Sequence, residues 1–594
     1  MSVTPRGMSV QEAYRSFRDG AFRVNRQYQR KLVWTLQEKQ KLIDSLLRGY
    51  PIPLILLAVR PLQDGSREFE ILDGMQRLNA VFSFIENKFS IDGHYFDVQQ
   101  LSRAKQLADE GVFKAQESDV LAPDLCADFL DYTLAVTEFP AVDGDAVNEV
   151  FSRINSYGRQ LSPQERRQAG VLTPFANAIR EVAAEIRGDV SRISLDLADM
   201  PEISVDVNAD DPGLGIRADD TFWCKQGVLR KNQLREGEDE QLLADLAISI
   251  LLEEPFAFSG AALDEVYDED SIESQRVSDA LRQYGVDALK HDLLTTISIL
   301  RGVVEDVDSS PNAMRRIVHP TAGSNPIKTA FYAIAMAFYE LCIREEKSPR
   351  DSALVMRALA NIQPRLSIAA GQIGSDSRRQ NINVAKGVIS SLFDERSPPA
   401  SVQGAGLMIR FENSLRRSKV ETAAFECKQG FLSLNGSREI NLSLLDRLLE
   451  TICGIANVGP SSEGAIFVGV ADNLKDANRI AALDGLESLK VGERFVVGVD
   501  REARLLGEDL DVYKRRFVQH VRASNMSEPL KTSVLSNVDC ITYRGMSVLC
   551  IWVPSQKKLS SVGDMVFLRH GAETVKVEGL TRMQAAMEIF QHAN

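Results

Sequence analysis

The chain has 594 residues, of which 44% are hydrophobic and 26% charged, as expected for a globular protein of several domains. Its 69 basic and 83 acidic side chains give a net charge of −14, which excludes binding of nucleic acid over the whole surface. Seven cysteines lack CxxC spacing and histidine neighbours, so we expect reduced thiols and no zinc site.

The first residues lack the apolar segment of a secretory signal, and no apolar run reaches the roughly 18 residues that span a bilayer. The sequence therefore predicts a cytoplasmic protein that does not contact a membrane. A homo-oligomer is an open alternative to a monomer.

Residues 68–85 predict a strand, a tight turn and a helix. The turn is Asp73-Gly74, since glycine tolerates positive φ and aspartate bonds the following backbone. Gln76 and Arg77 then lie in the first helical turn, where free N–H groups and the helix dipole favour an anion. A solvated arginine is the alternative. One face of the helix is apolar: Leu78, Val81, Phe82 and Ile85.

Three further motifs accompany this loop in chain order, at residues 28–34, 43–53 and 150–165. The series resembles the ParB/sulfiredoxin-like N-terminal domain of the GmrSD type IV restriction family. That family has a DGQQR loop, followed later by an Ile-Asn pair and a Leu-Ser-x-x-Glu helix start. The resemblance implies a mixed α/β domain over residues 1–175.

The same resemblance implies that the loop binds a nucleoside triphosphate, ATP or GTP. Gln76 and Arg77 would contact phosphate, Gly74 would allow close backbone approach, and Asp73 would orient a metal or water. Met75 stands where the family has glutamine, so we expect nucleotide binding more firmly than hydrolysis. The chain has no GxxxxGK[ST] motif to replace this loop.

Residues 176–393 predict a mainly helical domain, because 241–253 and 327–343 carry apolar residues at helical spacing. The acidic stretches 196–220 and 236–273 are expected to be solvated loops and helix faces. Residues 394–406 are small, polar and proline-bearing, which predicts a linker.

Residues 407–594 predict a compact α/β domain. A Glu-x-x-x-x-Glu-x-Lys pattern ends at Lys428, and a helix at 442–457 ends in Ala-Asn. A strand then leads to Asp472, and a late Phe-Leu-Arg-His-Gly follows. Over residues 408–580 this order resembles the Schlafen AlbA-type domain, with its Arg-x-Gly hairpin.

The carboxylates of this domain are candidate ligands for Mg²⁺ or Mn²⁺, which prefer oxygen. Glu421 and Glu426 converge only if Glu421 precedes the strand that carries Glu426. Asp472 follows the next strand, and Lys428 would assist at the developing phosphate charge. In nucleolytic Schlafen proteins, similarly spaced acids cleave tRNA-like RNA, so the resemblance implies a catalytic role for Glu421, Glu426 and Asp472, beside which Lys428 is the fourth catalytic candidate.

Two other interpretations of these residues stay open. Glu426 and Lys428 would form an ordinary ion pair, with Asp472 in a turn. Alternatively, Glu426-Cys427-Lys428 is the E-x-K of a restriction-type nuclease, which would act on DNA. An HNH nuclease is not expected, because the histidines are widely scattered: His94, His291, His319, His520, His570 and His592.

Together these patterns predict a nucleotide-responsive anti-phage defence protein. The N-terminal domain would sense, the helical domain would transmit, and the C-terminal domain would cut nucleic acid, with RNA favoured over DNA. One alternative is a non-catalytic regulator that binds nucleotide or nucleic acid. Another is a type IV-like DNA restriction nuclease whose chemistry depends on Arg77.

Overall fold

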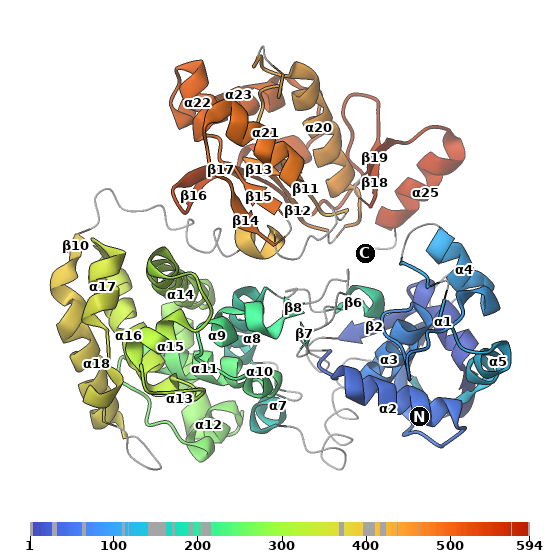
Figure 1. Cartoon of the computed structure of the whole chain (residues 1–594), viewed down its shortest axis with the longest axis horizontal. Helices are drawn as coiled ribbons and strands as arrows, with labels where there is room; N and C mark the ends of the chain where they lie inside the picture. Colours follow the sequence, from blue (N-terminus) through green and yellow to red (C-terminus); the bar gives the residue numbers. More distant parts are fainter. Residues whose placement is uncertain are drawn as a thin grey trace. The chain divides into compact units, whose positions relative to one another are not determined.

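The computed structural model divides into two compact units, Met1–Ala400 and Ser401–Asn594 (Figure 1). The division falls within the predicted linker 394–406, whose first two residues still belong to the strand pair β9 (Lys347–Pro349) and β10 (Phe393–Glu395). In the part that the structure describes, no helix has the length and apolarity needed to cross a membrane. The structure describes residues 4–25, 32–61, 67–109, 113–116, 118–140, 162–168, 171, 173–188, 194–200, 203–204, 216–367, 374–395, 410–415, 423–435, 438–460, 462–492, 494–571 and 573–591.

The first unit begins with a mixed six-stranded sheet in the order β1-β5-β3-β4-β2-β6, in which β6 is green in Figure 1 and β2 is blue. Apolar side chains of this sheet and of its helices share one core, with Tyr14, Phe22 and Phe82 among the fully buried residues. The strands are β1 (Thr4–Ser9), β2 (Phe22–Asn25), β3 (Ile55–Pro61), β4 (Arg67–Asp73), β5 (Thr133–Pro140) and β6 (Ser194–Asp196); the helices are α1 (Val10–Arg18), α2 (Leu36–Leu47), α3 (Met75–Ile85), α4 (Ser102–Asp109) and α5 (Pro123–Asp131).

The rest of the first unit is mainly helical, as expected from the 3.6-residue periodicity. The predicted helix at 241–253 is α11, and the one at 327–343 is α16, continued by a π-helical turn at Glu340–Arg344. The helices are α7 (Pro163–Gln168), α8 (Pro174–Arg187), α9 (Phe222–Lys225), α10 (Lys231–Arg235), α11 (Glu238–Leu251), α12 (Gly260–Tyr267), α13 (Ile272–Tyr284), α14 (Val286–Val307), α15 (Ala313–Val318), α16 (Lys328–Tyr339), α17 (Ser352–Ala358) and α18 (Ser375–Ile389).

One prediction for this region is wrong: the acidic stretch 236–273 is not wholly solvated. Asp239 and Glu240 are buried and both pair with Arg187. Asp245 is buried as well and pairs with Arg378, whose Nη1 donates to it at 2.7 Å. A buried carboxylate needs a charged partner, so these acids hold the helices together. Local sequence did not reveal this, because the partners come from other helices.

The second unit contains a four-stranded sheet, β11-β12-β17-β16, and a three-stranded sheet, β13-β15-β14. The chain passes from one sheet to the other at Gly469, whose φ of 108° breaks the strand predicted to lead to Asp472 into β12 and β13. The strands are β11 (Phe425–Lys428), β12 (Gly464–Val468), β13 (Val470–Ala471), β14 (Leu489–Val491), β15 (Arg494–Val496), β16 (Val538–Tyr543), β17 (Met546–Val553), β18 (Phe567–His570) and β19 (Glu573–Lys576); the helices are α20 (Leu442–Ala456), α21 (Leu474–Asp484), α22 (Asp500–Leu506), α23 (Leu510–Ala523), α24 (Leu530–Leu535) and α25 (Leu580–Gln591).

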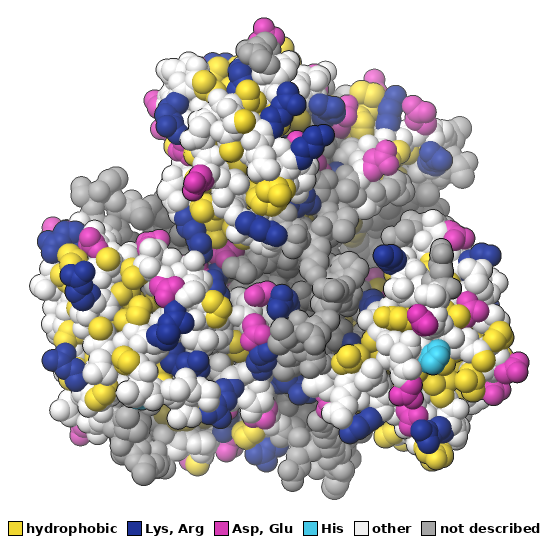
Figure 2. Space-filling model, in the orientation of Figure 1, with side chains coloured by type: hydrophobic (Ala, Val, Ile, Leu, Met, Phe, Trp, Pro, Cys, Tyr) yellow, Lys and Arg dark blue, Asp and Glu magenta, His cyan; other side chains and the backbone are white. Residues whose placement is uncertain are grey.

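The two units differ in charge. Residues 401–594 contain 24 basic and 23 acidic side chains, a net charge of +1, which leaves 45 basic and 60 acidic side chains, or −15, for residues 1–400. On the face shown in Figure 2, Lys and Arg side chains are spread among acidic and apolar ones rather than gathered into one patch. The acidic excess of the chain therefore lies in the first unit, and the second is nearly neutral.

Candidate functional site

The loop Asp73–Arg77 joins β4 to α3, so the predicted strand, turn and helix are confirmed. Gly74 is the N-cap of α3 with a φ of 104°, and a Cβ at this position would lie 3.0 Å from the Ile55 side chain. Both the backbone conformation and the close approach therefore require glycine. The N-cap residue makes no side-chain hydrogen bond to the first turn of α3, and the positive end of the helix dipole there favours an anion.

Arg77 is held by two hydrogen bonds that both come from one nitrogen of its guanidinium. Its Nη2 donates to the Asp73 carboxylate at 2.7 Å and to the Leu54 carbonyl at 2.9 Å. Within the described residues, neither Nε nor Nη1 makes a hydrogen bond, and the side chain is 14% exposed. The group is therefore oriented by the protein, and because Nε is buried, Nη1 is the donor that a ligand could reach.

Gln76 makes a structural contact that the sequence did not indicate. Its Oε1 accepts hydrogen bonds from the backbone N–H groups of Val33, at 3.1 Å, and Trp34, at 3.3 Å. The amide oxygen thus ties the start of α3 to the segment that precedes α2. Met75, at the position where the related family has glutamine, is buried in the core with 3% exposure.

The same segment connects the loop to the helical region. Thr35 and Glu38 form a reciprocal capping box at the start of α2, and Glu38 also accepts from Arg235 of α10 at 3.1 Å. This link was not predicted from the sequence. The capping box itself could have been predicted, because Thr35-x-x-Glu38 is its sequence pattern. The contact with Arg235 could not, because no sequence pattern pairs these two distant residues.

In the second unit, Glu426 lies on β11 and is only 5% exposed. Its Oε1 accepts from Lys428, two residues along the same strand. Its Oε2 lies 3.1 Å from Nη2 of Arg569, which comes from β18 and is 1% exposed. The carboxylate is therefore neutralised on both oxygens, so the ion pair considered as an alternative above is present, extended by a second cation.

Asp472 does not meet Glu426 in this site. It directly follows β13, in the other sheet, and its Oδ1 accepts from Arg494 at 2.6 Å. Glu421 precedes β11, as convergence would require, but lies outside the described residues. Across the described ranges, no three His, Cys, Asp or Glu side chains gather closely enough to hold a metal. The described donors thus do not fit a metal ion.

Arg569 connects three elements of the second unit. Its Nη1 donates to Thr574 Oγ1 of β19 at 3.0 Å, and Nη2 lies 3.4 Å from the Phe425 carbonyl of β11. On α20, a Cβ at Gly454 would lie 3.2 Å from the Arg569 side chain, so this helix leaves room for the arginine. The predicted Arg-x-Gly hairpin is therefore the element that closes over Glu426.

Asn457, at the end of α20, fixes the same hairpin and was not identified as important from sequence. It is fully buried, and its Nδ2 donates to the carbonyls of Phe567 and Ser560, each at 2.9 Å. Its Oδ1 accepts from the Ser560 N–H at 2.7 Å. The Ala-Asn motif at this helix end is thus a brace for β18.

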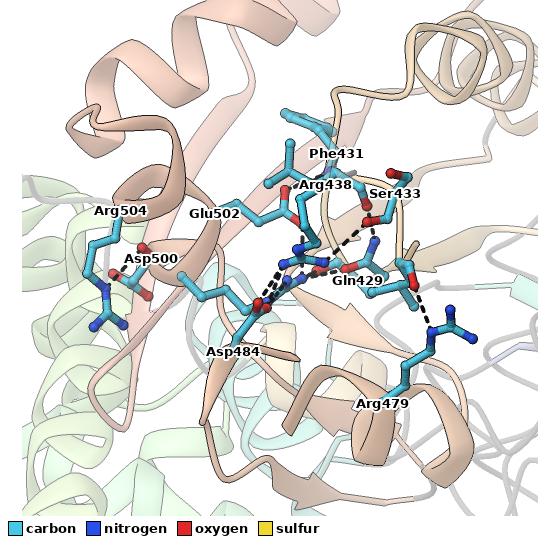
Figure 3. A network of polar contacts seen from close by, with 12 residues as sticks. Gln429, Phe431, Ser433, Arg438, Arg479, Asp484, Asp500, Glu502 and Arg504 are labelled. Carbon is cyan, nitrogen blue, oxygen red and sulfur yellow. Dashed lines mark hydrogen bonds and ion pairs between the residues drawn. The ribbon is translucent and has the colours of Figure 1, made fainter. Parts of the chain in front are cut away.

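A buried network fixes the chain just beyond β11 (Figure 3). Arg501 donates to the Gln429 carbonyl at 2.5 Å and to Asp484 at 2.7 Å, and Asp484 also binds Arg438. Glu502 accepts from the Phe431 N–H at 2.6 Å. Burial raises the pKa of Glu502 above its ordinary value of 4.5, although its donors and Arg501 lower it. The network holds Gln429, Phe431 and Arg438, and none of these bonds goes to Glu426.

Comparison with known proteins supports part of this assignment. Residues 10–172 match the family model described as the N-terminal domain of the GmrSD restriction endonuclease. Neither the curated proteins nor the solved structures contain a match to the chain. The GmrSD-type character of the N-terminal part is therefore confirmed, whereas the ParB-like fold and the Schlafen resemblance of residues 408–580 stay predictions.

Proposed function

We propose that the chain is a restriction-type anti-phage defence protein that cleaves nucleic acid under the control of a nucleotide bound at Asp73–Arg77. The observation that carries this proposal is the match of residues 10–172 to the N-terminal domain of a restriction endonuclease. The arrangement of the matched loop is consistent with it, because Nη1 of Arg77, in the first turn of α3, has no hydrogen-bond partner among the described residues. DNA is the expected substrate of a GmrSD-type nuclease.

Nucleotide binding follows from the same geometry. The first-turn N–H groups, the positive end of the α3 dipole and the oriented Arg77 guanidinium all favour a phosphate group. Such a phosphate would compete with Asp73, whose side chain is 48% exposed, for Arg77. Loss of the Arg77 donors should therefore weaken binding of any phosphate ligand.

A second candidate places cleavage in the second unit, with RNA as substrate and Mg²⁺ or Mn²⁺ held by Glu421 and Glu426. Asp472 follows a strand of the other sheet and pairs with Arg494, so it would join them as a ligand only after a rearrangement. The observation in its favour is a strand, Phe425–Lys428, that carries a 5%-exposed carboxylate and a lysine side by side. Buried charges are costly, so they are often retained for function. The candidate requires a cation to displace Lys428 from Glu426.

One assay separates these functions. Purified full-length protein would be incubated with plasmid DNA or total tRNA, with and without Mg²⁺ or Mn²⁺ and ATP or GTP. Arg77→Ala, Glu426→Gln and, as a surface control, Arg67→Ala at a 56%-exposed arginine would be compared with wild type. DNA cutting that requires Arg77 but survives Glu426→Gln supports the first candidate.

The remaining outcomes decide the alternatives. tRNA cutting that is lost in Glu426→Gln supports the second candidate, with Lys428 and Asp472 as the next residues to test. If wild type binds nucleotide but leaves both substrates intact, the protein is a non-catalytic regulator, and the proposal of cleavage is wrong.

A further inference from the structure

One five-residue segment beside the phosphate loop exposes two large apolar side chains. Tyr50 is 55% exposed and Leu54 is 50% exposed. Among the large hydrophobic side chains of the described ranges that are mainly exposed, Tyr50 is the only aromatic one. Isolated exposed apolar residues are ordinary, but a pair on one short segment beside a candidate site indicates a binding surface.

The backbone of this segment is fixed before any ligand binds. The Tyr50 N–H donates to the Ser45 carbonyl at 2.8 Å, and the Tyr50 carbonyl accepts from the Tyr132 hydroxyl at 2.8 Å. Pro51 and Pro53 then restrict φ in the residues that follow. The backbone that carries the aromatic ring is thus already ordered, so little conformational entropy of the backbone would be lost when a ligand binds.

The segment leads directly to the phosphate loop. The Leu54 carbonyl accepts from Arg77, and the next residue, Ile55, packs beneath Gly74. Leu54 lies four positions after Tyr50, so their backbones are at most about 13 Å apart in an extended chain. An extended nucleoside triphosphate can span such a distance from its phosphates to its base.

We propose that Tyr50 and Leu54 form the base-binding wall of this site, with the base of a nucleoside triphosphate stacked on the Tyr50 ring. This assignment rests on the proposed function, because it takes the phosphates to lie at Asp73–Arg77. Stacking on an aromatic ring tolerates any base, so ATP and GTP should both bind. The phosphates give affinity through charge, and the wall adds affinity only for ligands that carry a base.

The test compares ligands with and without a base. Titration calorimetry on the full chain would measure the Kd of ATP, GTP and inorganic tripolyphosphate for wild type, Tyr50→Ala and Tyr50→Phe. Leu125→Ala is the matched control, because Leu125 is a 42%-exposed apolar residue of the same region. Tyr50→Ala should raise the Kd of ATP and GTP about 5- to 100-fold, the usual contribution of base stacking, and leave tripolyphosphate unchanged.

Tyr50→Phe should bind like wild type, because the ring rather than the hydroxyl is required. The inference is overturned if Tyr50→Ala leaves the Kd of ATP and GTP unchanged, or if it weakens tripolyphosphate equally. Failure of the proposed function would look different. If wild type binds neither ATP nor tripolyphosphate, the proposal that Asp73–Arg77 binds phosphate is wrong, and so is the base-binding wall that depends on it.

Discussion

The two units each place an arginine beside a carboxylate, but in opposite ways. Arg77 binds Asp73, whose side chain is 48% exposed, and its Nη1 has no hydrogen-bond partner among the described residues. The side chains of Arg569 and Glu426 are both almost fully buried, and Lys428 covers the other carboxylate oxygen. The first arrangement leaves positive charge for an anion, whereas the second neutralises itself. A sequence motif therefore indicates a binding site only where the fold does not already neutralise the charged side chains of the motif.

Replacing Arg569, the arginine of the neutralised pair, should have the largest effect on stability. We expect Arg569→Met to destabilise the second unit by about 3–5 kcal/mol, because it leaves the Glu426 carboxylate buried beside a single lysine. Hydrogen exchange of β12 and β17 in the full chain would measure this loss. Arg504→Met, at an exposed arginine of the same unit, is the control and should change exchange little.

The Arg569→Met variant also tests the metal candidate. If Mg²⁺ or Mn²⁺ restored protection in this variant, Glu426 would be acting as a metal ligand, and its description as a closed ion pair would be wrong. A loss below about 1 kcal/mol would likewise contradict the closed arrangement, since such values are typical of exposed pairs.

The next effect concerns the segment that follows β11. We expect Gly430→Ala to cost about 1–3 kcal/mol, because its Cβ would lie 1.9 Å from Oε1 of the buried Glu502 and force the network apart. Urea unfolding followed by hydrogen exchange would locate the loss to residues 429–438. Gly302→Ala, where nothing lies within 4 Å in the described structure, should not destabilise.

Arg77 should contribute less to stability than to the binding of a phosphate ligand. We expect Arg77→Met to cost about 1 kcal/mol, because Asp73 is largely solvated and one neutral acceptor, the Leu54 carbonyl, is lost. Tripolyphosphate binding should nevertheless disappear in calorimetry. Arg48→Met, at a 59%-exposed arginine, should retain binding. Equal stability losses in Arg77→Met and Arg569→Met would remove the contrast between the two sites.

The smallest effect on stability is expected at the contact between Glu38 of α2 and Arg235 of α10. Partial burial raises the pKa of the Glu38 carboxyl, but hydrogen bonds from Thr35 and the charge of Arg235 outweigh it, so the pKa is lowered below 4.5. This stabilisation is present above pH 4.5 and is lost as the pH falls through the lowered pKa. Glu38→Gln keeps the capping oxygen but loses the charge.

We therefore expect Glu38→Gln to cost about 0.5 kcal/mol at neutral pH, an amount limited by solvent screening of a one-third-exposed side chain. The difference from wild type should vanish well below pH 4.5. Thermal unfolding at the two pH values would measure it. A difference that grows on acidification would show that the charge of Glu38 does not support this link.

Local order was predictable wherever neighbours along the chain decide it. Asp73-Gly74 and the apolar face from Leu78 to Ile85 specify a turn and a helix without help from distant residues. The amphipathic pattern of 442–457 likewise gave α20 nearly to the residue. Prediction failed at Gly469, because a switch between two sheets depends on which strands are available to pair.

By itself, the sequence determined the loop at Asp73–Arg77, the residue types in it and the periodic helices of the first unit, since these depend on backbone preference and side-chain spacing. Only the tertiary structure decided what each charge meets. Glu426 faces Arg569 rather than Asp472, and Asp239 is buried against Arg187 rather than solvated. The physical reason is that a charge takes its role from the groups that surround it in space, and these come from segments far apart in the chain.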